Sequence, residues 1–263
     1  MKQMVKTGRL FFAIGMGAFG IHQLLYADLK PVLIATWPTW LHGIHLLSYI
    51  GNLGLIAACL AIIVGRNARL WTIFAGTLLL ILFLINHIPY QLSTNPGFVG
   101  GWSDALKALA ISGGFFSVAG SLHEIESGSD GKSYDWIKPL EKIIPFGKIF
   151  FSFTIIIFGI EHFLYPGFVE TLVPSWIPWH TFWTYFAGAA LIVSGLAIIF
   201  NFKARPAAAL LGIMIFIWFA ILHLPRGFAD PYSGNGNELR SVFESLAFSG
   251  IAFVIAGTTK KSK

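Results

Sequence analysis

Eight long apolar runs constrain the fold of this chain more than any other feature of its sequence. Each run has about 17–24 residues, enough for a helix to cross a hydrocarbon core of about 30 Å. Backbone groups in lipid must be hydrogen-bonded internally, so such runs are expected to be helices. Only 11% of the 263 residues are charged, whereas soluble domains carry about 25%. We therefore predict an all-α polytopic membrane protein with eight transmembrane helices, at about 9–27, 41–64, 69–89, 103–121, 148–165, 180–201, 205–225 and 239–257.

The second half of the chain repeats motifs of the first half at a nearly constant offset. His87 and His223 each stand two positions before a proline, and Ala-Ile-Ser-Gly at 110–113 corresponds to Ala-Phe-Ser-Gly at 247–250. An even number of spans per copy predicts parallel repeats, related by an axis along the membrane normal. The segment between the copies mixes both charge signs and is expected to be solvated, with a short amphipathic stretch at its end. The predicted units are a first four-helix repeat at 1–122, a cytoplasmic linker at 123–146 with the amphipathic stretch at 136–144, and a second four-helix repeat at 147–263.

The distribution of lysine and arginine predicts the orientation of the chain in the membrane. If the N-terminus is cytoplasmic, that side carries fourteen basic residues, and the outer side carries Lys30, Lys107, Arg226 and Arg240. Because basic loops stay in the cytoplasm, both termini are expected there. The formal charge of +6 does not indicate a nucleic-acid partner, since the basic residues are spread over short loops and tails. The single cysteine, Cys59, excludes an internal disulfide and a Cys-x-x-Cys redox pair.

Polar residues near the outer ends of the helices are the candidate functional groups. Seven of the eight histidines fall at these ends, and only His123 falls at the inner face. A charge at the centre of a span costs about 2.5–3.5 kcal/mol, so Lys107, Glu161 and Glu244 are expected to face the bundle interior and to pair. Lys107 would meet Glu244 or Glu161, or alternatively extend to the outer interface. The candidate pocket consists of His22, Gln23, His87, Lys107, Glu161, His162, His223 and Glu244.

One interpretation of this cluster is a pocket for a quinone or another redox ligand. A quinone needs a hydrogen-bond donor at its carbonyl, an apolar slot and a route for protons. Here His162 or His223 would donate to the carbonyl, and Glu161 or Glu244 would handle the proton. The sequence itself does not assign catalytic residues.

Three other interpretations compete with the quinone pocket. A metal site would use His42-x-x-His45, but this spacing is not diagnostic and the second copy lacks the pair, so no metal ligands are assigned. A structural role would make the polar groups fix helix ends and loops, as in a non-enzymatic scaffold or assembly subunit. A small-molecule permease would need a polar lane through the inner halves of the spans, which are almost purely apolar.

The start of the second copy resembles a family motif. Gly159–Pro166 reads Gly-x-x-His-Phe-x-x-Pro, and Leu172–Pro178 reads Leu-Val-Pro-x-Trp-Ile-Pro. Both patterns resemble those of the DoxX-like membrane proteins. The resemblance covers nearly all of 148–257 and, more loosely, 9–120, so the chain looks like two DoxX-like units fused in tandem.

The resemblance implies a bacterial inner-membrane protein built from four-helix units. The family takes its name from a subunit of a thiosulfate:quinone oxidoreductase, which implies a redox-associated subunit with quinone and membrane or periplasmic subunits as partners. The first copy departs from the pattern, because His22 is one place early and Ala27 replaces the proline. The second copy is therefore the better candidate for a functional site.

Overall fold

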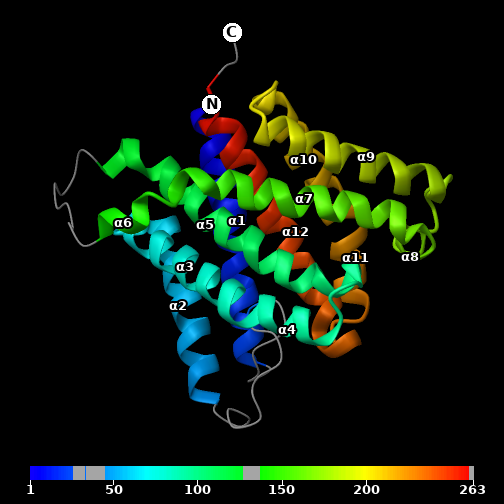
Figure 1. Ribbon diagram of the computed structural model, residues 1–263, viewed down its shortest axis with the longest axis horizontal. Helices are drawn as coiled ribbons and strands as arrows, with labels where there is room; N and C mark the ends of the chain where they lie inside the picture. Colours follow the sequence, from blue (N-terminus) through cyan, green and yellow to red (C-terminus); the bar gives the residue numbers. More distant parts are fainter. Residues whose placement is uncertain (26–32, 34–44, 127–136, 261–263) are drawn as a thin grey trace.

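The protein is helical throughout the part of the chain that its computed structural model describes (Figure 1). The described residues are 1–25, 33, 45–126 and 137–260, with the backbone alone described at 45–48, 123–126 and 233–235. Across these residues there is no β-strand. The predicted all-α class is therefore confirmed.

Seven helices are long and apolar enough to cross a membrane. They correspond to seven of the eight predicted spans, and a shorter apolar helix, Tyr49–Val64, falls within the remaining one. The first part of that predicted span, 41–44, lies outside the described residues. The seven helices are Lys2–Leu25, Ala68–Thr94, Val99–Leu122, Lys138–Leu164, His180–Ile199, Ala204–Ala229 and Gly236–Thr258.

The described elements follow one another in a simple order, and several of the long helices are interrupted by short π- or 3₁₀-helical turns. In chain order they are α1 (Lys2–Leu25), α2 (His45–Val64), α3 (Ala68–Leu82), η2 (Phe83–His87), α4 (Ile88–Thr94), η3 (Val99–Trp102), α5 (Ser103–Glu126), α6 (Lys138–Glu141), η5 (Ile144–Phe146), α7 (Gly147–Leu164), α8 (Pro166–Glu170), α9 (His180–Ile199), α10 (Ala204–Trp218), η6 (Phe219–His223), α11 (Leu224–Ala229) and α12 (Ser233–Thr258).

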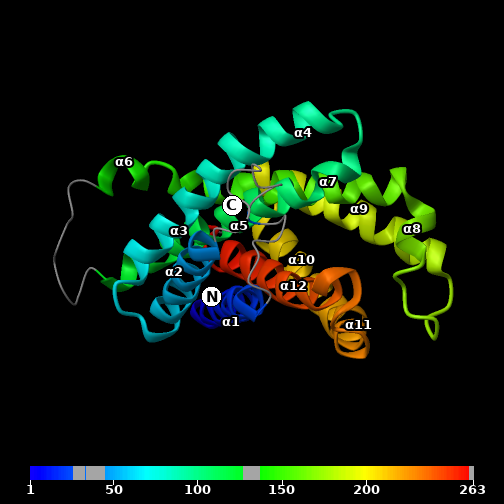
Figure 2. The ribbon, with the colours of Figure 1, turned by 90° about the horizontal axis from the view of Figure 1, so that it is seen from below.

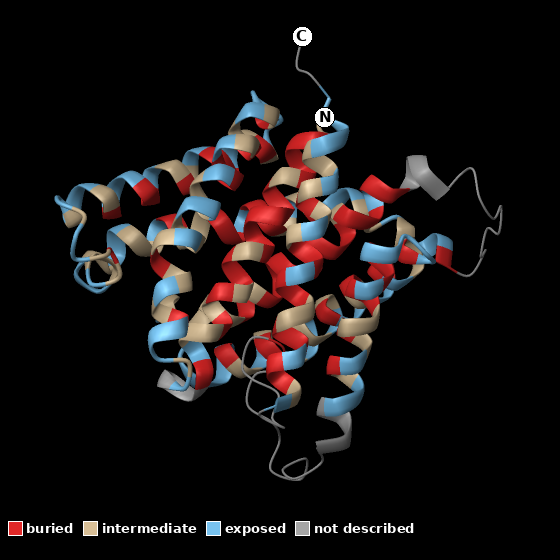
Figure 3. Ribbon diagram, turned by 180° about the vertical axis from the view of Figure 1, so that it is seen from behind, coloured by how far each residue is buried: buried red, intermediate tan, exposed pale blue. Residues whose placement is uncertain are grey.

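Helices α5 and α12 form the centre of the bundle. In the apolar stretches that contain α5 and α12, 83% and 67% of the residues are buried, against 22–39% in the other candidate spans. Figure 3 shows the buried residues gathered along the middle of the molecule. Around this centre, α1 packs on α2 and α12, α5 on α3 and α7, and α10 on α9 and α12 (Figure 2). The first helix therefore packs mainly on the last one, and α7 packs on α5.

Two close approaches between helix backbones depend on glycine. A Cβ atom on Gly8 of α1 would lie 2.6 Å from the carbonyl oxygen of Gly250 on α12. A Cβ atom on Gly147 of α7 would likewise lie 2.6 Å from the carbonyl oxygen of Gly113 on α5. Small residues allow such close packing between membrane helices. Any side chain at these positions would push the helix pair apart.

Serine hydroxyls tie the third long helix of each half to the central helix beside it. The Ser112 hydroxyl on α5 donates to the carbonyl oxygen of Gly76 on α3 at 2.7 Å. The Ser249 hydroxyl on α12 donates to the carbonyl oxygen of Gly212 on α10 at 2.9 Å. Both bonds are buried, and each stabilises the packing between neighbouring helices.

Two π-helical turns lie immediately before a proline-containing turn. η2 ends at His87 and is followed by Pro89, and η6 ends at His223 and is followed by Pro225. A proline ring clashes with the carbonyl four residues earlier and removes a hydrogen bond, so the helix widens at that point. Such π-bulges occur frequently at functional sites.

The described part of the predicted linker is packed on the bundle. Arg69 of α3 forms an ion pair with Glu141 of α6 at 2.8 Å, and Ile137 is buried in a small cluster with Ile73 and Ala119. These contacts hold the segment against the bundle, while the residues from 138 to 146 remain partly or fully exposed, so the solvated linker stays a prediction. The preceding residues, 127–136, lie outside the described part, and so does the start of the predicted amphipathic stretch.

Candidate functional site

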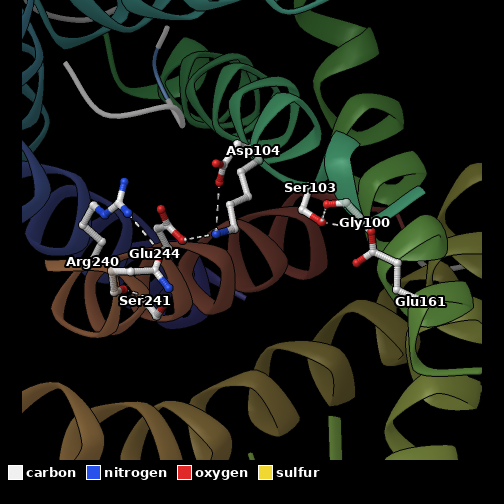
Figure 4. A network of polar contacts seen from close by, with 9 residues as sticks. Gly100, Ser103, Asp104, Glu161, Arg240, Ser241 and Glu244 are labelled. Atoms are coloured by element: carbon white, nitrogen blue, oxygen red, sulfur yellow. Dashed lines mark hydrogen bonds and ion pairs between the residues drawn. The ribbon is translucent and has the colours of Figure 1, made fainter. Parts of the chain in front are cut away.

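A buried ion pair joins the two central helices. Lys107 Nζ of α5 lies 3.0 Å from Glu244 Oε2 of α12 and 3.6 Å from Asp104 Oδ1 (Figure 4). The side chains of Lys107 and Glu244 are 21% and 7% exposed. Of the alternatives left open by the sequence, Lys107 thus contacts Glu244. A buried pair of this kind is costly to break, because removing one partner leaves the other charge without compensation.

Glu161 of α7 contacts the same central region from the other side. Its Oε1 atom accepts a hydrogen bond of 3.0 Å from the Ser103 hydroxyl, which also donates to the carbonyl oxygen of Gly100 at 2.8 Å (Figure 4). Ser103 stands one turn before Lys107 on α5. Glu161 therefore borders the cluster around Lys107 but is anchored by Ser103.

The histidines of the second half have different surroundings. His162 Nδ1 lies 2.7 Å from the carbonyl oxygen of Phe158, one turn earlier on α7. This bond holds the imidazole against its own helix. His223 ends η6 and directly precedes the proline-containing turn of α11.

The polar candidates of the first half are fully enclosed. His22, Gln23 and His87 are 3%, 0% and 1% exposed. The His22 ring lies 5.9 Å from the ring of Phe243 on α12, edge to face. These residues therefore belong to the interior of the bundle.

Sequence reasoning missed two charged residues of the cluster, Asp104 and Arg240. Arg240 was counted as an outer-side basic residue, but α12 begins at Ser233, so Arg240 lies two turns inside the helix and is 6% exposed. Its Nη2 atom donates to Asn237 Oδ1 at 3.0 Å. The available signal was the spacing, because Arg240 stands four residues before Glu244 and Asp104 stands three before Lys107, on shared helix faces.

Two adjoining cavities lie in the second half. The loop cavity, of about 340 Å³, lies beneath the segment Leu172–Trp176 and has Glu170, His180 and Arg226 among its polar lining residues. The α9–α10 groove, of about 750 Å³, is lined almost entirely by apolar side chains of α9 and α10. Ile221 of η6 lines both cavities.

The two cavities are distinct from the predicted pocket. Among the described residues that line them, none is one of the eight candidates from the sequence. Of these candidates, Lys107 and Glu244 form an ion pair with each other, and Glu161 is bonded to Ser103 on the same helix as Lys107. Hydropathy and spacing identified polar groups within the helices. They could not identify an open cavity, because a cavity depends on the distances between α9, α10 and the loop that joins α8 to α9.

Metal ligands do not gather in the described part of the chain. Among those residues, no group of three or more histidine, cysteine, aspartate or glutamate side chains could hold a metal ion. His42 and the side chain of His45 lie outside the described residues. The metal interpretation of that pair therefore stays a sequence hypothesis.

Comparison with known proteins places one family match over the cavity region. The model of a family described as a domain of unknown function (DUF8561) matches residues 151–227. This range contains every residue that lines the loop cavity and the α9–α10 groove. No curated protein and no solved structure matches the chain.

Proposed function

We propose that the chain is an eight-span membrane protein built from two parallel four-helix repeats of the DoxX-like type. The long helices of the first repeat would be α1, α2, α3 and α5. Those of the second repeat would be α7, α9, α10 and α12. Contacts that occur once in each repeat support this proposal. The close approach of Gly8 to Gly250 corresponds to that of Gly147 to Gly113, and the π-helical turn η2 corresponds to η6. Each first helix packs on the fourth helix of the other repeat, and α5 meets α12 in the centre. A pseudo-twofold axis would then pass between Lys107 and Glu244.

The proposed location is a bacterial inner membrane with both termini on the cytoplasmic side. The excess of lysine and arginine on the side of the N-terminus supports this orientation. The start of α1 and the end of α12 lie side by side, since Gly257 contacts Val5. An even number of spans would place these two helix ends on the same side.

We further propose that the protein binds a quinone-type amphiphile that enters from the bilayer, as a redox-associated subunit. The observation that carries this proposal is the junction of the loop cavity and the α9–α10 groove at Ile221. The groove offers an apolar slot, open to lipid, for a long tail. The loop cavity offers His180 and Arg226 as hydrogen-bond donors and Trp176 as an aromatic wall for a head group.

In this proposal the donor roles differ from the expectation drawn from the sequence. His162 is held by the carbonyl oxygen of Phe158, and neither His162 nor His223 is among the residues that line the two cavities. The head group would instead meet His180 and Arg226. Electrons would come from a partner subunit, since the single cysteine provides no dithiol couple.

A quinone titration in lipid nanodiscs tests this proposal. Trp176, Trp183 and Trp218 line the cavities, so a bound decyl-quinone should quench tryptophan fluorescence in a saturable manner. Ala190→Phe fills the middle of the groove and should weaken binding at least about tenfold, because the tail loses its slot. Gly54→Phe is the matched control, since its position on α2 has open space within 4 Å of an added Cβ atom.

Two outcomes of the titration contradict the quinone proposal. One is fluorescence quenching that rises linearly with quinone, as simple partition into the bilayer would give. The other is equal affinity in the wild type and Ala190→Phe, with both proteins equally stable to heating.

The second candidate function is a non-enzymatic scaffold or assembly subunit. The observation that favours it is that the candidate polar residues are used in packing, with Lys107 and Glu244 joining the two central helices. Replacing His180, which lines the loop cavity, by alanine separates the candidates. Weaker quinone binding would favour the quinone pocket, whereas unchanged quinone binding and unchanged assembly of any redox complex would favour the scaffold.

A further inference from the structure

The polar cluster around Lys107 contains more buried positive charge than buried negative charge. Lys107 and Arg240 contribute two cations, and Glu244 contributes the carboxylate between them (Figure 4). The Asp104 side chain also pairs with Lys107, but it lies at the edge of the cluster and is 38% exposed. Burying an uncompensated ion is costly, so a buried excess charge calls for a counter-ion.

Part of the hydrogen-bonding capacity of Arg240 has no partner in the described part of the chain. Its Nη2 atom donates to Asn237, but neither Nε nor Nη1 has a hydrogen-bond partner among the described residues. Both atoms are buried. Most buried polar atoms in proteins are hydrogen-bonded, so each exception indicates a missing water, ion or ligand. Two free donors on one guanidinium suit an anionic oxygen or a halide.

The repeat offset explains why Arg240 has no acidic partner from α1 among the described residues. Arg240 stands 137 positions after Ser103, the same offset that relates 110–113 to 247–250. Ser103 contacts Glu161 of α7 at 3.0 Å. The position on α1 that corresponds to Glu161 is His22. Gly15 of α1 lies against Phe243 of α12, so His22, two turns further along α1, lies level with the first turns of α12. The contact between α5 and α7 therefore has the carboxylate of Glu161, whereas the corresponding contact between α12 and α1 has Arg240.

We propose that Arg240 binds a small monovalent anion of halide size in the buried corner between α1 and α12. The Nε and Nη1 atoms of Arg240 donate to this anion. Lys107 adds to the positive potential, and Glu244 opposes binding because its carboxylate is nearby on the same helix face. The anion compensates the excess charge and stabilises the contact between the first and last long helices.

Thermal unfolding of the full-length protein in detergent tests the anion site. Chloride is titrated against gluconate at constant ionic strength, so that general screening does not change. The wild type should show a saturable rise in melting temperature with chloride. Arg240→Gln should lose this dependence. Arg226→Gln is the matched control, because Arg226 is already paired with Glu238 at 2.9 Å, and it should keep the full chloride response.

A gain-of-affinity variant keeps the proposal testable even if Arg240→Gln folds poorly. Glu244→Gln removes the opposing carboxylate and should lower the half-saturating chloride concentration at least about tenfold, as expected for removing a unit charge at short range in a partly buried site. Absence of any chloride response in the wild type would overturn the proposal. It would also be overturned by an unchanged chloride response in Arg240→Gln or by weaker chloride binding in Glu244→Gln.

Discussion

Replacing Lys107 by methionine should destabilise the protein by about 3 kcal/mol. The change leaves the Glu244 carboxylate, 7% exposed, without its partner at 3.0 Å. At an effective dielectric constant of about 20, the attraction across such a distance is about 5 kcal/mol before desolvation is counted. Removing one member of a buried pair typically costs 3–5 kcal/mol. We place Lys107→Met at the lower end, because the lysine side chain is 21% exposed.

A double-mutant cycle isolates the energy of this pair. The cycle uses Lys107→Met, Glu244→Gln and the double variant, unfolded reversibly in mixed micelles with gluconate as the anion. The expected coupling between the two sites is at least about 2 kcal/mol, within the range for residues in direct contact.

The chain provides its own control pair for this cycle. Arg226 and Glu238 also form an ion pair at 2.9 Å, but their side chains are 38% and 25% exposed. Exposed pairs contribute about 0.2–1 kcal/mol, so the Arg226→Gln and Glu238→Gln cycle should fall in that range. A Lys107–Glu244 coupling no larger than the Arg226–Glu238 coupling would contradict the conclusion that Lys107 and Glu244 form a buried ion pair.

Three further predictions concern the packing and the orientation of the chain. Gly8→Ala should lower stability by about 1–3 kcal/mol, because its Cβ atom meets the α12 backbone at 2.6 Å, while Gly54→Ala, with open space around it, should be neutral or slightly stabilising in the same melting assay. Ser249→Ala should cost about 0.5–1.5 kcal/mol, measured by unfolding in micelles, because its buried hydroxyl donates to the α10 backbone. In a background without the native cysteine, Gly97→Cys should react with an impermeant maleimide in intact cells and Arg66→Cys should not; the reverse pattern would contradict the proposed orientation.

The extent of the helices was largely predictable from the sequence. A hydrocarbon core accepts only helices or closed barrels, so runs of apolar residues translate almost directly into spans. The predicted ends were less accurate, since α12 begins at Ser233 rather than near 239. That error placed Arg240 at the outer end of its span, among the outer-side basic residues, and so hid one cation of the central cluster. The glycine-rich composition of 234–236 suggested a loop where the helix in fact begins.

The candidate site was predicted only in part. The cost of burying charge predicted that Lys107 would pair inside the bundle, and its partner is Glu244. The same reasoning did not identify the loop cavity or the α9–α10 groove, because apolar lining residues such as Ile221 look like any other lipid-facing residue in a hydropathy profile. The Leu172–Trp176 motif was noted as a family pattern, and it lines the loop cavity.

The sequence by itself determined that this chain is helical, that its helices suit a membrane, and that a few polar groups must be enclosed among them. These properties depend on local composition, because the free energy of placing a segment in lipid is a sum over its own residues. Only the tertiary structure decided that α1 packs on α12, that Arg240 is buried with two donors unpaired among the described residues, and that two cavities meet at Ile221. Those features depend on contacts between segments that are more than a hundred residues apart in the sequence. The hydropathy of any one segment does not determine which segments will contact each other.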